Sequence, residues 1–240
     1  MAIPARIGST RLPRKVLLEI NGKPMLHHVI ERCLETELVE EVFVVTDSQE
    51  VYDSVSSTSA KALMSDPDCS SGTARIASVI DQLPGEIIVN VQADQPVVEP
   101  DLIDSLIYEL VENEADIATP VWKIRSAEDL EDDSLAKVVR DHKGYALYFS
   151  RSPIPFLRDI ERMQWTTRAV YWSHYGIYAY TRKILETLDE IPIGVLEQFE
   201  KLEQLRFLEN DFKVMTVETS YRQMAVDTYE DLKKIKQIMR

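Results

Sequence analysis

The chain has 240 residues, 45% of them hydrophobic, and a formal net charge of −14, which predicts a soluble globular protein with a substantial core. An acidic chain repels phosphate polymers, which argues against nucleic acid or an anionic membrane as a partner. The sequence shows no apolar run of membrane-spanning length and no secretory leader, and its two cysteines are too few for a disulfide framework or a zinc site. We therefore expect a cytoplasmic protein.

Helix and strand patterns alternate through the first half of the chain. Strands are expected at residues 42–47 and 86–91, two short apolar runs that end in polar residues, as strands buried on both faces do. Helices are expected after Pro24, where apolar residues recur at helical spacing up to Leu38, and over Asp101–Glu112. This alternation predicts βαβ units around a mainly parallel sheet.

From about residue 115 the sequence pattern changes from alternating helices and strands to strands joined by turns. Residues 136–141 and 145–151 flank a DHKG turn and predict a hairpin, and residues 169–181 are typical of one long aromatic strand. A helix is expected over Leu196–Glu209.

The end of the chain returns to the α/β pattern, with a strand in FKVMTVET and a helix after Asp227. No linker rich in Gly, Ser or Pro separates the two halves. We therefore expect a single α/β domain over residues 1–240, with a mixed-sheet insertion at about 115–190.

A cluster of positive charge stands out near the start of this acidic chain. The stretch PARIGSTRLPRKVL carries four cations and no acid, and it follows the expected first strand, where doubly wound sheets bind phosphate. Its single glycine, Gly8, matches neither a Walker loop nor a dinucleotide-binding fingerprint. Guanidinium and ammonium groups would instead bind a phosphate, with Arg6, Arg11 and Lys15 as donors; a solvated basic loop is the alternative.

Several blocks of sequence together resemble one enzyme family. In chain order they are PARIGSTRLPRKVL, NGKPMLHHVIERC, CSSGTAR, VNVQADQP, YALYFSRSPIPFLRD, SHYGIYAY, LEQFEKLEQLR and AVDTYEDL. This order resembles the 3-deoxy-manno-octulosonate (Kdo) cytidylyltransferases, also called CMP-Kdo synthetases, over nearly the whole chain. The resemblance implies a Rossmann-like nucleotidyltransferase fold. It also implies that the anomeric hydroxyl of a 2-keto-3-deoxy sugar acid attacks the α-phosphorus of CTP, and that pyrophosphate leaves.

The resemblance also implies roles for individual residues. Arg6, Lys15 and Asp94 would be catalytic, and Asp94 and Asp227 would bind Mg²⁺, an ion that takes few protein oxygens and completes its shell with water and phosphate. The nucleotide-binding candidates are Arg6, Ser9, Thr10, Arg11, Lys15, Ser71, Gly72, Arg75 and Gln92. The sugar-binding candidates are Arg151, Arg158, His174, Tyr178, Glu203 and Gln204.

Simpler structural roles compete with some of these assignments. Asp227 could be a helix N-cap, Glu203 and Gln204 could be solvated, and His174 and Tyr178 could belong to the core. The chain departs from the family pattern at Arg14, Ala74, Ala93 and Gln95. Ala93 replaces a glycine, so its φ is either ordinary or strained. These departures leave open another 2-keto sugar acid, such as 8-amino-Kdo or a nonulosonate, or a nucleotide-binding protein without turnover.

A homodimer is the assembly that the resemblance implies. The mixed-sheet region is rich in aromatic residues, which favour an interface but can equally fill the core of one subunit. These residues are Tyr145, Tyr148, Phe149, Phe156, Trp165, Tyr171 and Trp172.

Overall fold

The structure, a computed structural model, describes residues 1–8, 12–222 and 224–239. The predicted phosphate-binding residues Ser9, Thr10 and Arg11 lie outside these ranges. By its internal contacts the chain divides into two compact units. Unit 1 comprises residues 1–107, 179–188 and 223–240, and unit 2 comprises residues 108–178 and 189–222. Unit 2 thus begins near the predicted start of the mixed-sheet region and continues beyond its predicted end.

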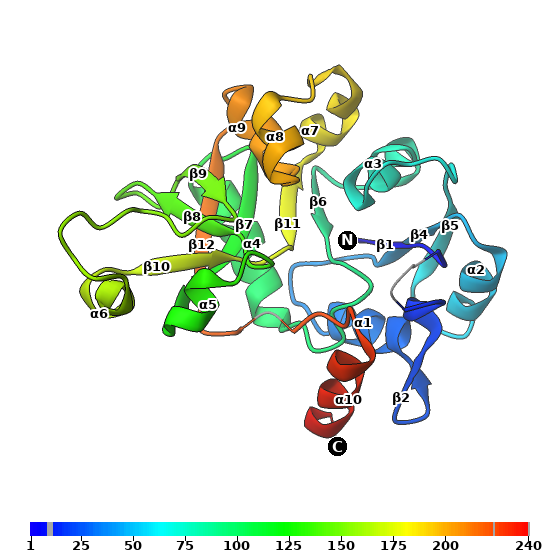
Figure 1. The fold of residues 1–240 in the computed structure, drawn as a ribbon. Helices are drawn as coiled ribbons and strands as arrows, with labels where there is room; N and C mark the ends of the chain where they lie inside the picture. Colours follow the sequence, from blue (N-terminus) through cyan, green and yellow to red (C-terminus); the bar gives the residue numbers. More distant parts are fainter. Residues whose placement is uncertain (9–11, 223, 240) are drawn as a thin grey trace. The chain divides into compact units, whose positions relative to one another are not determined.

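Unit 1 is built on strands in the order β5-β4-β1-β6-β11, of which β5, β4, β1 and β6 run parallel to one another. Figure 1 shows β1, β4 and β5 side by side, with α2 outside them. In the parallel register, Ile3 lies opposite Val44, which lies opposite Ala62. The strands are β1 (Ala2–Ala5), β4 (Phe43–Thr46), β5 (Lys61–Met64), β6 (Ile87–Asn90) and β11 (Tyr178–Thr181), and a short hairpin joins β2 (Glu19–Ile20) to β3 (Lys23–Pro24). Both strands predicted for this half are confirmed.

The helices of unit 1 follow the apolar periodicity of the sequence. In α1 (Met25–Leu34) the apolar stripe is buried, whereas Leu38, which the sequence pattern included, lies beyond the helix and is exposed. The helix predicted over Asp101–Glu112 is α4 (Pro100–Glu112), which continues from unit 1 into unit 2. The others are α2 (Gln49–Val55), α3 (Gly72–Ala77), α7 (Arg182–Glu186) and α10 (Tyr229–Ile238), with 3-10 turns at Lys15–Leu17 and Ile80–Gln82. A further 3-10 turn, Leu188–Glu190, begins at the last residue of segment 179–188 in unit 1 and continues into unit 2.

Unit 2 contains the predicted mixed sheet, in the order β12-β7-β10-β8-β9. The pair β12–β7 is parallel, and the other neighbours are antiparallel, including the predicted hairpin β8–β9. The strands are β7 (Ile117–Ile124), β8 (Lys137–Arg140), β9 (Ala146–Ser150), β10 (Tyr171–His174) and β12 (Val214–Thr219). The helices are α5 (Ala127–Glu131), α6 (Trp165–Arg168), α8 (Val195–Glu200) and α9 (Gln204–Glu209), with a 3-10 turn at Arg162–Gln164. The α/β fold class with a mainly parallel sheet and a mixed-sheet part is therefore confirmed.

Each of the two long elements predicted in this region is divided into two shorter ones. The strand expected over residues 169–181 is two strands, because the chain turns tightly where the Ile177 N–H donates to the carbonyl of Tyr175. The buried Thr119 hydroxyl donates to the Ile177 carbonyl at 2.8 Å and stabilises this turn. The helix expected over Leu196–Glu209 is α8 and α9, because Lys201 has a φ of 55°, a left-handed conformation that a right-handed helix cannot continue.

Burial separates the aromatic residues that the sequence grouped as a dimer surface. Trp165 and Tyr171 are 2% and 0% exposed and pack with Trp122, Ile124 and Leu130 in the core of unit 2. Phe149 is also fully buried, whereas Phe156 is 74% exposed. For those three buried rings the core alternative is correct.

Candidate active site

A cavity of about 260 Å³ lies in unit 1, where the loops after β1 and β6 meet the start of α3. Ligands in α/β sheets bind beyond the carboxyl ends of parallel strands, so its position agrees with the basic cluster after the first strand. The predicted residues that line it are Arg6, Lys15, Ser71, Gly72, Arg75, Gln92, Asp94 and Asp227. The sequence therefore identified most of the polar lining of this cavity.

Lys15 stands between the two predicted metal ligands. Its Nζ donates to Asp94 Oδ2 at 2.6 Å and to Asp227 Oδ1 at 3.1 Å. Burial lowers the pKa of Lys15, but the charges and hydrogen bonds of Asp94 and then Asp227 outweigh it, so that the pKa lies above its usual value. The cavity therefore holds a charged ammonium group together with two carboxylates.

Backbone contacts bring the two carboxylates together from opposite ends of the chain. The N–H of Val226 donates to the carbonyl of Asp94 at 2.9 Å, which fixes the segment before α10 against the loop after β6. The N-cap of α10 is Thr228, in a capping box with Asp231, so the N-cap interpretation of Asp227 is wrong. Because Thr228 caps the helix, the Asp227 carboxylate remains available to Lys15.

The CSSGTAR loop approaches the first strand closely. Ser71 caps α3, with its Oγ accepting from the Ala74 N–H at 3.0 Å. A Cβ on Gly72 would lie 3.0 Å from Pro4 Cγ and 3.3 Å from Gln92 Oε1, tighter than side chains normally pack. A larger residue here would therefore have to displace the side chains of Pro4 or Gln92 by a few tenths of an ångström, and Gly72 and Gln92 lie together in the cavity wall.

Arg75 is a buried, paired guanidinium rather than a free cation. It is 3% exposed and donates to Asp47 Oδ2 at 2.9 Å and to Ser65 Oγ at 2.5 Å. These contacts fasten the start of α3 to the loops after β4 and β5. The structure therefore gives Arg75 a supporting role in the cavity wall, and a direct contact with the nucleotide stays a prediction.

The departures beside Asp94 are accommodated without backbone strain. Ala93 is not among the described residues with positive φ, so its conformation is one that alanine adopts readily. Gln95 is 1% exposed and its amide lies in the protein interior, not at the cavity surface. Lys15 pairs with Asp94 and Asp227 with both of these side chains in place.

The sugar-binding candidates lie in unit 2, where Arg151 is already engaged. Its Nε donates to the Glu200 carbonyl at 2.7 Å, and its Nη1 donates to the Asp133 carbonyl at 2.8 Å. The Glu200 carboxylate in turn accepts from Ser150 Oγ at 2.6 Å and from the Arg151 N–H at 2.9 Å. These bonds tie the end of β9 to the end of α8.

Sequence reasoning missed Glu200. In LEQFEKLEQLR it is one acid among several on an apparently solvated helix, and no spacing signal singles it out. Its importance comes from partners about 50 positions away in the chain.

A second group of candidates in unit 2 comprises His174, Tyr178 and Gln204. The Tyr178 hydroxyl donates to Gln204 Oε1 at 3.2 Å, and the rings of His174 and Tyr178 have centroids 5.3 Å apart. Gln204 is 3% exposed, so the solvated-surface alternative is wrong for it. Glu203 is half-buried and directly precedes α9.

Burial sets the charge states in this group. Desolvation lowers the pKa of His174 to about 3, so that the imidazole is neutral, with Nε2 lying 2.9 Å from Thr119 Oγ1. Desolvation, and then the charge of Glu203, raise the pKa of Tyr178 well above its usual range. Both rings are therefore neutral hydrogen-bonding groups.

Arg158 lies outside this cluster. Its side chain is 90% exposed, and its partner is the neighbouring Asp159, at 3.6 Å. The structure thus brings Tyr178 together with Gln204 and His174, and leaves Arg158 in solvent.

Comparison with known proteins agrees with the cavity and the fold. The family model described as "Cytidylyltransferase" matches residues 1–235. The chain belongs to the cytidylyltransferase family. It is therefore a nucleotidyltransferase, and the unit 1 cavity is its candidate nucleotide site.

Individual members of this cytidylyltransferase family match the chain over almost its whole length. A 3-deoxy-manno-octulosonate cytidylyltransferase of Geobacter sulfurreducens is 43% identical over 97% of this chain and 96% of the relative. An 8-amino-3,8-dideoxy-manno-octulosonate cytidylyltransferase of Shewanella baltica is 40% identical over 99% and 96%. A solved CMP:2-keto-3-deoxy-manno-octonic acid synthetase complexed with CTP superposes with a TM-score of 0.93, at 39% identity over 99% of this chain and 96% of that one.

Two structural features are not found among the described residues. Among the described residues, no helix combines the length and the apolar character needed to cross a membrane. Nor do the described residues contain a group of three or more His, Cys, Asp or Glu side chains placed to hold a metal ion.

Proposed function

We propose that this cytidylyltransferase transfers CMP from CTP to the anomeric hydroxyl of Kdo, releasing pyrophosphate and forming CMP-Kdo. The superposition on a CMP-Kdo synthetase complexed with CTP, with a TM-score of 0.93 over 99% of the chain, carries this proposal. The cavity in unit 1 supports it, because cations and carboxylates for a triphosphate and its metal lie together there.

Positioning and charge neutralisation dominate this kind of reaction, since phosphoryl transfer needs no covalent nucleophile from the protein. Arg6 and Lys15 line the cavity and would neutralise phosphate oxygens as the α-phosphorus is attacked. Ser71, Gly72 and Gln92 line the same cavity and would surround the cytosine end.

We propose Mg²⁺ as the cofactor. Asp94 and Asp227 fit the ion because both carboxylates already converge on one cation, the Lys15 ammonium, at 2.6 and 3.1 Å. Mg²⁺ favours one or two carboxylates completed by phosphate and water, which matches a pair without further protein ligands in the described structure. When bound, the ion would neutralise phosphate charge.

For the sugar acid we propose the residues of unit 2. Tyr178, Gln204 and neutral His174 offer hydrogen bonds suited to hydroxyls, and the exposed Arg158 offers a planar pair of donors suited to a carboxylate. Arg151 would act differently from our sequence-based expectation, since it holds backbone carbonyls and would position its neighbours.

The choice between Kdo and its 8-amino analogue is the sharpest alternative, because relatives of both names match at 43% and 40% identity. Pyrophosphate release would be measured with CTP and, in turn, Kdo, 8-amino-Kdo and a nonulosonate. We expect the highest kcat/KM with Kdo. A higher value with 8-amino-Kdo would reassign the sugar, and no release with any of them would indicate a nucleotide-binding protein without turnover.

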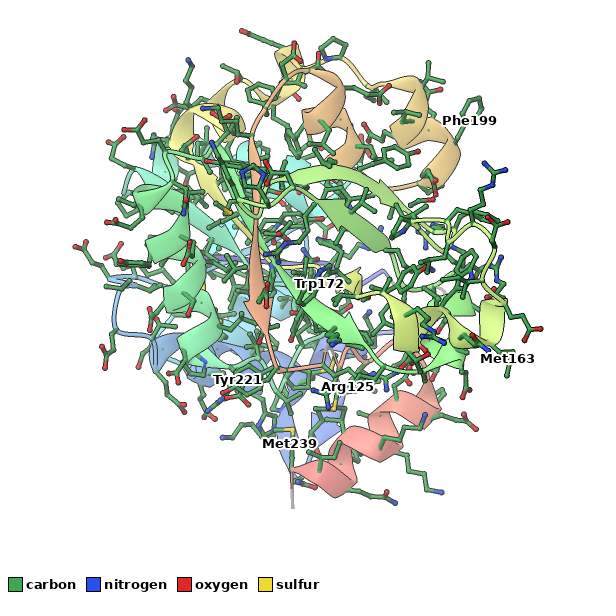
Figure 2. All side chains as sticks on the ribbon, turned by 90° about the vertical axis from the view of Figure 1, so that its left-hand side faces the viewer. Arg125, Met163, Trp172, Phe199, Tyr221 and Met239 are labelled. Atoms are coloured by element: carbon green, nitrogen blue, oxygen red, sulfur yellow. The ribbon has the colours of Figure 1, made fainter. Side chains whose placement is uncertain are left out.

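We also propose that the protein works as a homodimer in the cytoplasm and supplies CMP-Kdo for lipopolysaccharide synthesis. Unit 2 carries several large apolar side chains in solvent, including the aromatic and methionine types that are enriched at protein interfaces. Leu147, Phe156 and Met163 are 63%, 74% and 79% exposed, and Phe199 is 80% exposed and points outward from α8 (Figure 2).

A further inference from the structure

The place expected for a metal ion holds a lysine side chain. Lys15 Nζ makes hydrogen-bonded ion pairs with both Asp94 and Asp227. The side chains of Lys15 and Asp94 are only 15% and 22% exposed, so water screens their attraction incompletely. A single ammonium group therefore does for the two carboxylates what a divalent ion would do: it neutralises part of their repulsion at short range.

Backbone hydrogen bonds restrain the segments that carry the two carboxylates. The Val226 N–H bonds to the Asp94 carbonyl at 2.9 Å, and the capping box formed by Thr228 and Asp231 fixes the start of α10 directly after Asp227. These bonds hold the backbone on both sides of the pair, so the two carboxylates remain within reach of one cation. A cation between them lowers their repulsion.

We propose that Lys15 is the internal counter-cation of the metal-binding pair, which keeps Mg²⁺ out until the nucleotide arrives and then transfers to its phosphates. This inference rests on the proposed magnesium site and deepens it. Lys15 thereby couples metal binding to nucleotide binding, in addition to gripping the triphosphate.

Charge counting explains the coupling. Counting only the ion pairs among the described residues, two carboxylates and the Lys15 ammonium carry one net negative charge. Mg²⁺ alone would make it positive and would lie against the ammonium, which costs free energy at this distance. A triphosphate brings several negative charges, so Lys15 can leave the carboxylates for phosphate oxygens while the metal replaces it.

The test measures binding of Mg²⁺ alone, without nucleotide or sugar, by isothermal titration calorimetry. The variant Lys15→Met keeps an unbranched side chain of nearly the same length and removes its charge. We expect Lys15→Met to bind Mg²⁺ about ten- to a hundredfold more tightly than the wild type, the range that one charge-assisted hydrogen bond represents. The same variant should bind CTP more weakly, so metal and nucleotide affinities move in opposite directions.

Control variants test whether the change in Mg²⁺ affinity comes from the cluster of Lys15, Asp94 and Asp227. Lys23→Met removes an exposed lysine that pairs with Glu31, and it should leave Mg²⁺ binding unchanged. Adding Asp94→Asn to Lys15→Met should abolish the gain, because one carboxylate is lost. If Lys15→Met does not fold, Lys15→Gln serves in its place, since its neutral amide can still donate to a carboxylate and should give a smaller gain in the same direction.

Two results would overturn the inference, and they are distinguishable. Equal Mg²⁺ affinities of wild type and Lys15→Met without nucleotide, together with tight Mg²⁺ binding by the wild type when CTP is present, would contradict the role of Lys15 alone. No Mg²⁺ binding by either protein, with or without CTP, would remove the magnesium site and the inference together.

Discussion

We expect unit 2 to become less stable to unfolding in acid because of His174, which is neutral and buried in the native state. Its pKa is about 3 when folded and 6.5 in an unfolded chain. A lowered folded pKa contributes stability that is complete above pH 6.5 and is lost progressively as the pH falls toward 3, because only the unfolded chain then binds the proton. Between pH 7 and pH 5 the unfolding free energy should fall by about 2 kcal/mol, because each pH unit below 6.5 removes about 1.4 kcal/mol.

The variant His174→Gln isolates this contribution, because glutamine keeps an N–H donor for Thr119 and does not titrate. Urea unfolding would be followed by tryptophan fluorescence, which reports on unit 2 since Trp122, Trp165 and Trp172 all lie there. From pH 7 to pH 5 the wild type should lose about 2 kcal/mol of unfolding free energy relative to the variant. A difference that does not change with pH would refute the buried neutral imidazole.

Three further predictions concern activity and assembly. Asp94→Asn and Asp227→Asn should each lower turnover on the order of 100-fold, measured as pyrophosphate release, and near-normal turnover in either would contradict a catalytic metal pair. Glu200→Gln weakens the link between β9 and α8 within unit 2, so the apparent KM for Kdo should rise while that for CTP stays constant; a change confined to CTP would refute its positioning role. Light scattering at micromolar protein should give the mass of a dimer, and Phe199→Glu should shift it toward monomer; a wild type of monomer mass alone would exclude the dimer.

Local sequence determined the family, the fold class and the chemistry of the nucleotide cavity. A run of cations after a first strand and a carboxylate at the end of a buried strand are short-range patterns, and their positions follow from the topology of a parallel sheet. Arg6 and Lys15 could therefore be proposed as phosphate-binding residues from charge and position, the family resemblance added Asp94, and all three line one cavity in the structure.

Only the tertiary structure decided which partners these residues have. Lys15 and Asp227 are 212 positions apart, and no local pattern reveals that the ammonium bridges Asp227 and Asp94. Likewise, an arginine in a family motif looks free for a ligand in the sequence, whereas Arg151 uses its donors on backbone carbonyls 18 and 49 positions away.

The burial of individual side chains, and the points at which a helix or strand ends, could not be predicted from the sequence either. Phe156 and Trp165 have the same aromatic character in a sequence, yet one is 74% exposed and the other 2%, because burial depends on which other segments pack against each ring. The apolar periodicity of residues 196–209 is helical throughout, but the left-handed backbone at Lys201 divides it. The sequence by itself determines composition, periodicity and local charge, whereas burial and long-range pairing are set by the free energy of the whole packed fold.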